Sequence, residues 1–440
     1  MATSPASEKI PRFGLITAVL IIVADMIGTG ILTLPGFTAG SLNSGRLMVL
    51  AWSVGGFIAF CGAVSYARLA FAMPHSGGEY FYLSRLFHPA VGFLSAWISM
   101  VAGFSAPLAA AAIAFGTYGN HLFPGVAPFT SGLVMILAIT ALHMSNVRGG
   151  VYAQNAFSVI KILLILFLIA AGSFLLTSAK AAPPSGAEAG LLSPALAMSL
   201  IFISFAYSGW NASTYIASEI KNPERTVPLS LFIGVAIVAA LYVLLNITYV
   251  RHIGIAAMKG KVEVGYLLAD RIFGGYGAKV IAGIICLLLI SSVSSIMLAG
   301  SRVLSSVGED FSVLGLLAKR SRHGVPFYAV GVQCVIAIFI MATSSFDKIL
   351  YYIGFSISAF SFLAVLGSLR FIWNKKNSSS FAKACFLMLS ILFLVFTLWS
   401  MLFSISGNPS GVVYFLITIP VGYLCYLATR HRQRSSAQGK

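Results

Sequence analysis

The sequence predicts an all-α polytopic membrane protein, and three observations support this fold class. Of the 440 residues, 58% are hydrophobic and only 9% are charged. The mean hydropathy is +0.93, and soluble domains do not require so apolar a composition. The apolar residues also form long runs between short polar segments, and about 20 apolar residues are enough for one helix to cross a bilayer.

We predict twelve membrane-spanning helices, each long enough to cross with some tilt. Their approximate ranges are 13–38, 47–72, 89–118, 127–145, 153–177, 194–217, 227–250, 274–301, 325–343, 348–371, 382–404 and 409–429.

The net charge of +17 comes from basic residues that lie almost entirely in the loops between spans. That distribution is an orientation signal, and it argues against a nucleic-acid partner. Most of these residues fall on one side when the N-terminus is placed inside. We therefore expect a multi-pass protein of the cytoplasmic (inner) membrane with both termini in the cytoplasm. Residues 1–12 are polar, so we expect no cleavable signal peptide.

The structures of three connecting segments and of the C-terminal tail can also be predicted. Residues 73–88 are rich in aromatic side chains and predict a short helix at the inner mouth. Residues 178–193 contain two prolines and predict an exposed outer loop. Residues 251–273 mix charged and apolar positions, which favours short helices over the outer mouth. The basic tail, residues 431–440, is expected to be disordered near anionic lipid.

The first span is interrupted midway. Residues 21–35 read IIVADMIGTGILTLP, with Gly28-Thr29-Gly30 inside the apolar run. Glycine favours unwound backbone, which at membrane depth is stable only where it lines a protein cavity. The first half-helix would end in carbonyl groups and the second would begin with N–H groups. Such a break suits a ligand with both an ammonium and a carboxylate. The alternative is a glycine-rich face packed closely on a neighbouring helix.

The sixth span, SLIFISFAYSGWNASTYIASE, is also interrupted, at Ser208-Gly209. Two broken spans five apart predict a transporter with an inverted repeat, whereas two unrelated kinks are the alternative. The predicted organisation is an N-terminal tail (1–12), a first repeat of spans one to five (13–177), an extracellular loop (178–193), a second repeat of spans six to ten (194–373), spans eleven and twelve (374–430) and a cytoplasmic tail (431–440).

Five segments resemble the amino acid–polyamine–organocation superfamily, and most closely its L-type amino-acid transporter branch and bacterial relatives. The most specific is FAYSGWNASTYIASEIKNPERTVPLS at residues 205–230. The others are MIGTGILTLPG (26–36), PHSGGEYFYLSRLFHPAVGFLSAW (74–97), QNAFSVIK (154–161) and AGSRVLSSVGED (299–310). The resemblance implies a LeuT-like five-plus-five inverted repeat with broken first and sixth helices, and an amino-acid substrate at the two breaks.

The resemblance also implies roles for residues at the breaks. The substrate carboxylate would meet the N–H groups of Thr29 and Gly30, and its ammonium would meet carbonyls near Met26, Phe205 and Ser208. Phe205 would be an aromatic lid on the outer side, and Asn211 would line the pocket wall or bridge the broken helices. The predicted substrate-binding residues are Met26, Gly28, Thr29, Gly30, Phe205, Ser208, Gly209 and Asn211.

The chain departs from the family pattern at three places. The L-type branch has two glycines before its Trp-Asn pair, whereas here the first is Ser208. A hydroxymethyl group narrows the pocket and favours smaller or more polar substrates. Asp25 stands where the family has Asn or Gly, and Asp310-Phe311 replaces an Asp-Gly pair.

Two charges lie inside predicted spans. Lys161 is in the fifth span, where a lysine costs roughly 2.5–3.5 kcal/mol and should face the bundle interior. The resemblance implies that its ammonium replaces the sodium ion of sodium-coupled relatives. We hypothesise that Asp25 and Lys161 form a close, proton-sensitive pair. The alternatives are a static pair, an Asp25 that binds a cationic substrate, and a Lys161 that snorkels to the inner surface.

No motif indicates covalent chemistry. The five cysteines and seven histidines show no metal-ligand spacing, and a nucleophile–base set and a phosphate loop are both missing, so we expect no enzyme, metal or cofactor. The sequence favours sodium-independent transport of small to medium neutral amino acids by alternating access, as a permease or antiporter. The alternatives are a proton-coupled amino-acid or amine symporter or exporter, and an amino-acid sensor that does not transport. Expected partners are the substrate and the lipid bilayer, with the protein a monomer or homodimer.

Overall fold

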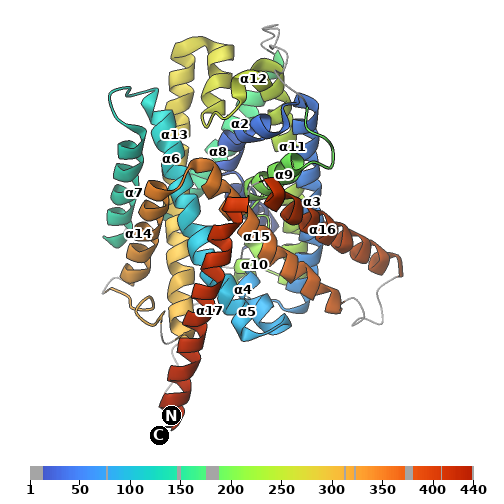
Figure 1. The fold of residues 1–440 in the computed structure, drawn as a ribbon, viewed down its shortest axis with the longest axis vertical. Helices are drawn as coiled ribbons and strands as arrows, with labels where there is room; N and C mark the ends of the chain where they lie inside the picture. The colour runs from blue at the N-terminus through green and yellow to red at the C-terminus, as the bar shows by residue number, and fades with distance from the viewer. Residues whose placement is uncertain are drawn as a thin grey trace.

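The structure, a computed structural model, describes residues 13–75, 78–145, 150–174, 188–311, 314–321, 324–371, 380–407 and 409–438. Within these ranges the secondary structure is helical, apart from one isolated parallel bridge between Phe13 and Ile220. The helices form an elongated bundle (Figure 1). The predicted all-α class is confirmed.

The α-helices are α1 (Leu15–Met26), α2 (Gly30–Leu42), α3 (Gly45–Ala72), α4 (Gly78–Leu86), α5 (Pro89–Ile98), α6 (Ala106–Asn120), α7 (Pro128–Met144), α8 (Gly150–Phe174), α9 (Pro194–Ala206), α10 (Ala212–Tyr215), α11 (Pro223–His252), α12 (Ile255–Met258), α13 (Val264–Asp310), α14 (Phe327–Thr343), α15 (Phe346–Ser368), α16 (Ser380–Gly407) and α17 (Pro409–Gln438). A π-helical segment, Ser99–Ser105, joins α5 to α6, and 3₁₀ turns follow α10 and α15.

Many of these helices are long and apolar enough to cross a membrane. Within the described ranges, seven continuous helical stretches are long and apolar enough to cross. α1 and α2 together are also long and apolar enough, as a pair bent by 44°. Four shorter apolar helices coincide with other predicted spans: α7, the Val159–Phe174 part of α8, α9 and α14. The multi-pass organisation is therefore confirmed, whereas the count of twelve crossings stays a prediction.

Several boundaries differ from the predicted ones. The third span is not one regular helix, because a π-helical segment interrupts it. The eighth span continues from a preceding helical segment through a bend at Gly274, whose φ of 73° favours glycine. The expected disorder of the tail is wrong, since α17 continues to Gln438. Residues 431–438 contain no glycine or proline to end a helix. The expected outer loop lies mostly outside the described ranges.

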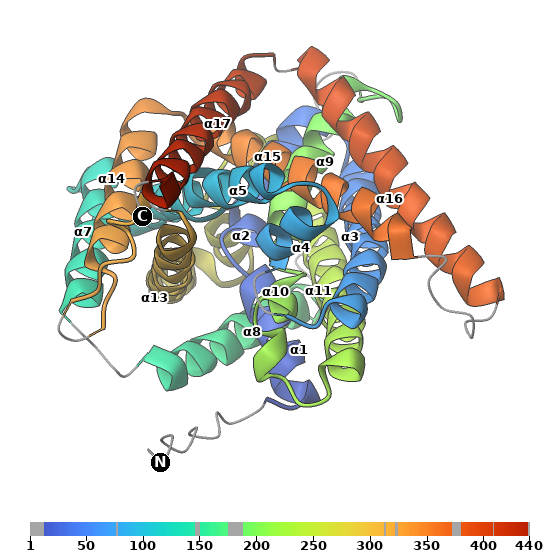
Figure 2. The ribbon, with the colours of Figure 1, turned by 90° about the horizontal axis from the view of Figure 1, so that it is seen from below.

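The broken helices lie in the interior of the bundle. α1 packs against α11, and α2 packs against α9. At the periphery, α16 and α17 are the least covered, with only 22% and 28% of their apolar windows buried against 72% for α15. Figure 2 shows both helices on the outside of the bundle. Their apolar outer faces are suited to lipid.

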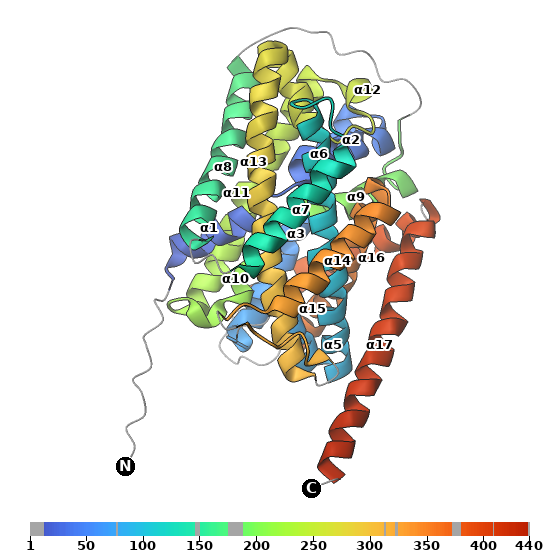
Figure 3. The same cartoon turned by 90° about the vertical axis from the view of Figure 1, so that its left-hand side faces the viewer.

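The two ends of the bundle carry different short helices. In Figures 1 and 3, α12 lies beside α2 at one end, and α4 and α10 lie toward the other. The short helices expected within residues 73–88 and 251–273 are therefore present as α4 and α12.

Candidate functional site

The first break follows Met26. Ile27 leaves the helical conformation with ψ of 85°, and α2 begins at Gly30. The first N–H groups of α2 have no carbonyl partner within the helix. A Cβ added at Gly28 would meet no heavy atom within 4 Å. Gly28 therefore faces open space beside unsatisfied backbone, as a ligand site requires.

The second break lies between α9 and α10. Residues 207–211 form turns, and Gly209 has a φ of 90°, a conformation that side-chain-bearing residues rarely adopt. α10 is a single turn, followed by a 3₁₀ turn at Ala217–Glu219. Both interruptions predicted from the sequence are therefore present.

The two breaks lie against each other. A Cβ at Gly30 would lie 2.7 Å from the Cα of Ala206, so the start of α2 touches the end of α9. A Cβ at Gly209 would lie 2.6 Å from Oδ2 of Asp25. Gly30 and Gly209 therefore allow the two breaks to pack closely on each other, whereas the space beside Gly28 is empty of protein atoms.

Tyr242 of α11 joins the two breaks, and the sequence analysis did not identify it. Its fully buried hydroxyl donates to the Met26 carbonyl at 2.6 Å and lies 3.3 Å from the Ala206 carbonyl. The N–H of Gly28 also donates to Met26, at 2.9 Å. Met26 thus accepts two hydrogen bonds already, the usual capacity of a carbonyl. No sequence motif distinguishes a tyrosine in the middle of a span that bridges two helix breaks from one that only packs in the core.

The remaining predicted residues lie close to the breaks with limited exposure. Thr29, Phe205 and Asn211 are 5%, 7% and 8% exposed. The Phe205 carbonyl accepts the N–H of Ser208 at 3.0 Å and also the N–H of Tyr207. The Asn211 side chain does not bridge the broken helices, because its Nδ2 points to Oε1 of Glu79 at 3.5 Å.

Comparison with known proteins identifies the family of this broken-helix arrangement. The sequence model of the family described as "Amino acid permease" matches residues 13–425. The chain belongs to the amino acid permease family. The superfamily resemblance carried by the motifs is therefore confirmed.

Three relatives of the permease illustrate the match. The human large neutral amino acids transporter small subunit 2 is 27% identical over 94% of this chain and 80% of its own. The human Asc-type amino acid transporter 1 is 26% identical over 95% and 83%. The mouse b(0,+)-type amino acid transporter 1 is 26% identical over 94% and 86%.

Lys161 of the permease is 6% exposed and lies beside the first break. It lines a small pocket that also touches Gly28, Leu32 and Ser292. The lysine therefore faces the bundle interior, as predicted, and does not snorkel to the inner surface.

Asp25 and Lys161 do not form a direct ion pair in this structure. Within the described ranges the only ion pair joins Arg320 to Glu309. Asp25 is exposed and lies against Gly209, whereas Lys161 is buried beside Gly28. The two charges nevertheless lie close enough to interact electrostatically, so the proton-sensitive pair stays a prediction.

Proposed function

We propose that the permease carries amino acids across the membrane by alternating access, without sodium. The observation that carries this proposal is the meeting of two broken helices beside open space at Gly28. Unwound backbone inside a membrane is otherwise unfavourable, and in transporters such breaks bind the substrate.

The substrate's charged groups have separate partners in this proposal. The carboxylate binds the N–H groups of Thr29 and Gly30 at the start of α2, where the helix dipole favours an anion. The ammonium binds the carbonyls near the breaks, with that of Ser208 as the main acceptor, because Met26 already accepts from Tyr242 and Gly28 and Phe205 accepts from two N–H groups of the second break. Gly209 and Asn211 complete the wall of the pocket.

Small to medium neutral amino acids are the proposed substrates. The hydroxymethyl group of Ser208, in place of a glycine, reduces the space beside the break. The relatives named above support the class, since one is named for large neutral amino acids. The division into two inverted repeats is part of the same proposal.

Lys161 supports sodium independence. Its ammonium lines the cavity between Gly28 and Ser292, and a buried cation repels a second cation at short range. Binding of a sodium ion beside Lys161 is therefore unfavourable, which argues against sodium-coupled transport.

We also propose that both termini face the cytoplasm. The start of α1 and the end of α17 lie toward the same end of the bundle (Figure 3), and the distribution of basic residues favours that side as the inner one. The proposed location is the cytoplasmic membrane, where the protein acts as a monomer or homodimer.

Counterflow in proteoliposomes tests the transport proposal. Purified protein is reconstituted with unlabelled L-alanine, L-serine or L-leucine inside, and uptake of the radiolabelled amino acid is followed with and without sodium. We expect transient accumulation that is the same in both salts. Protein-free liposomes are the control.

The alternatives give different results in the same assay. A sensor would bind amino acids, seen as a thermal shift, without counterflow. A symporter would take up substrate without internal amino acid when a proton gradient is applied. Accumulation that required sodium would contradict the role of Lys161.

A further inference from the structure

Glu79 is a buried carboxyl group that the substrate contacts above do not use. It lies in the first turn of α4, outside the membrane-crossing helices, and is 9% exposed. The elements that surround it are α3, α15 and the second break, through Tyr66, Ser361 and Asn211.

All three of these residues donate to the same carboxylate oxygen. Oε1 of Glu79 accepts from the Tyr66 hydroxyl, from the Ser361 hydroxyl at 2.9 Å and from Asn211 Nδ2 at 3.5 Å. Among the described residues, no hydrogen-bond donor contacts Oε2. Oε2 is therefore the oxygen to which a proton can add while Oε1 continues to accept.

No cation among the described residues balances Glu79. The nearby basic side chains are engaged elsewhere: Arg68 donates to the Phe371 carbonyl at 2.8 Å, Arg370 donates to the Leu86 carbonyl, and Arg85 lies 5.7 Å from the centre of the Phe81 ring. A buried carboxylate without a cation is unfavourable and tends to take up a proton.

The other titratable groups around Glu79 are tyrosines. Tyr66 faces it from α3 and Tyr215 from α10, and Tyr82 lies on α4 itself. α5 carries no titratable side chain, and those of α15 lie in its first two turns, away from Ser361. Burial raises the pKa of Glu79, and the hydrogen bonds from Tyr66 and Ser361 oppose this less strongly.

Ser361 connects Glu79 to a second cavity. This cavity, of about 50 Å³, lies between α3, α9, α15 and α16 and is separate from the one beside Lys161. Hydroxyl groups from three helices line it: Ser204, Ser358, Ser361, Thr397 and Ser400. The lining is otherwise mostly apolar, but these hydroxyl groups offer water the partners that it needs. Ser361 thus places Glu79 one hydroxyl away from a space suited to water.

We propose that Glu79 is a proton-binding site of the permease, distinct from the amino-acid site and coupled to it through Asn211. A proton from water adds to Oε2, the carboxylate becomes a neutral acid, and release reverses the step with no other group changing charge. The coupling rests on the proposed transport function, whereas proton binding does not.

Protonation weakens the contacts that converge on Oε1. A neutral carbonyl oxygen is a weaker acceptor than a carboxylate oxygen, so the bonds from Asn211 and Ser361 lose strength together. Asn211 belongs to the second break and Ser361 to α15. Loading the proton therefore loosens the inner end of the broken sixth span from α15, the kind of movement that alternating access requires.

Infrared difference spectroscopy on the full protein in liposomes tests proton binding without any substrate. Between high and low pH, the wild-type protein should gain the carbonyl stretch of a neutral carboxylic acid, and Glu79→Gln should lack that component. Ser361→Ala removes one donor from the charged form, so its protonation midpoint should move to higher pH. A spectrum unchanged in both variants would overturn the proposal.

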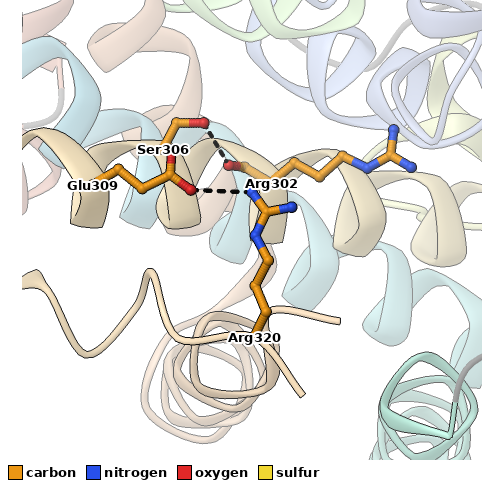
Figure 4. Close-up of polar contacts among 4 residues, drawn as sticks. All are labelled: Arg302, Ser306, Glu309 and Arg320. Atoms are coloured by element: carbon orange, nitrogen blue, oxygen red, sulfur yellow. Dashed lines mark hydrogen bonds and ion pairs between the residues drawn. The ribbon is translucent and has the colours of Figure 1, made fainter. Parts of the chain in front are cut away.

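Glu309→Gln is the matched control. Glu309 also lies toward the end of a helix, but it is 53% exposed and pairs with Arg320 at 3.1 Å (Figure 4). The loss of this carboxyl should leave the Glu79 component of the spectrum in place. If Glu309→Gln removed the component instead, Glu79 would not be the proton site.

Counterflow of L-alanine over a pH series then tests the coupling. We expect the wild type and Glu309→Gln to share a pH-dependent rate and Glu79→Gln to lose that dependence. A wild-type pH profile in Glu79→Gln would refute the coupling. If the wild type transports no amino acid at any pH, the transport function fails, while the infrared result still decides whether Glu79 binds a proton.

Discussion

Single glycines at the breaks have different physical roles. Gly30 and Gly209 are required because backbone or side-chain atoms approach within 2.7 Å of where a Cβ would lie, whereas Gly28 has no such neighbour. A substitution at Gly28 therefore tests the ligand space without disturbing the packing.

Gly28→Ala should preserve the fold and weaken substrate binding. A methyl group in a binding site changes affinity by roughly 1–3 kcal/mol, or about 10- to 200-fold. Isothermal titration with L-alanine measures the loss. Gly119→Ala is the control, because a Cβ there also meets nothing within 4 Å. Equal affinities in the two variants would place the substrate elsewhere.

Tyr242→Phe should loosen the join between the two breaks. The variant loses the 2.6 Å bond to the Met26 carbonyl, and a net hydrogen bond contributes about 1 kcal/mol. We expect a lower melting temperature and slower counterflow. On the same helix, Tyr249→Phe removes a buried hydroxyl that has no partner among the described residues, so it should not destabilise. The prediction fails if the two variants behave alike.

The pH dependence of stability should report the protonation of Glu79. Its raised pKa means that the folded protein binds the proton more tightly than the unfolded chain. The resulting stability is present below the ordinary pKa of 4.5 and is lost as pH rises through the raised value. The melting temperature of the wild type, relative to Glu79→Gln, should therefore fall as pH rises above 4.5.

At the scale of elements, the start of α1 is tied to the segment that follows α10. Phe13 donates its N–H to Glu219 at 2.8 Å and accepts from the N–H of Lys221 at 2.9 Å. This pairing joins the first half of one broken span to the second half of the other, so we expect them to move together.

Phe13→Pro should weaken this pairing, because proline has no N–H to donate. The loss of about 1 kcal/mol should raise amide exchange of Lys221 by roughly fivefold, measured by hydrogen–deuterium exchange. Phe13→Ala keeps both backbone bonds and serves as the control. Exchange that is equally fast in both variants would assign the effect to the lost aromatic ring.

At the scale of the molecule, the two intramembrane charges differ in access to solvent. Asp25 is exposed, whereas Lys161 is only 6% exposed. A membrane-impermeant thiol reagent should therefore modify Asp25→Cys much faster than Lys161→Cys, each measured against the native cysteines. Excess L-alanine should change the Asp25→Cys rate if the site alternates in access. Equal rates for both variants would contradict this arrangement.

Much of the architecture could be predicted because it depends on local sequence. The length of each apolar run predicts a membrane-crossing helix. Gly28 and Ser208-Gly209 predict the two breaks, because glycine changes the backbone conformation locally. The π-helical segment in the third span and the helical tail were not predicted, because the apolar run through 99–105 looks like ordinary helix and the basic tail looks like a solvated end of the chain.

The sequence alone determined the fold class, the family and the positions of the two breaks. Only the tertiary structure decided which side chains meet there. Tyr242 reaches Met26 across 216 residues of chain, and Ser361 reaches Glu79 across 282. The lack of a direct ion pair between Asp25 and Lys161 was decided in the same way. Such contacts depend on how whole helices pack, and helix packing leaves no local pattern in the sequence.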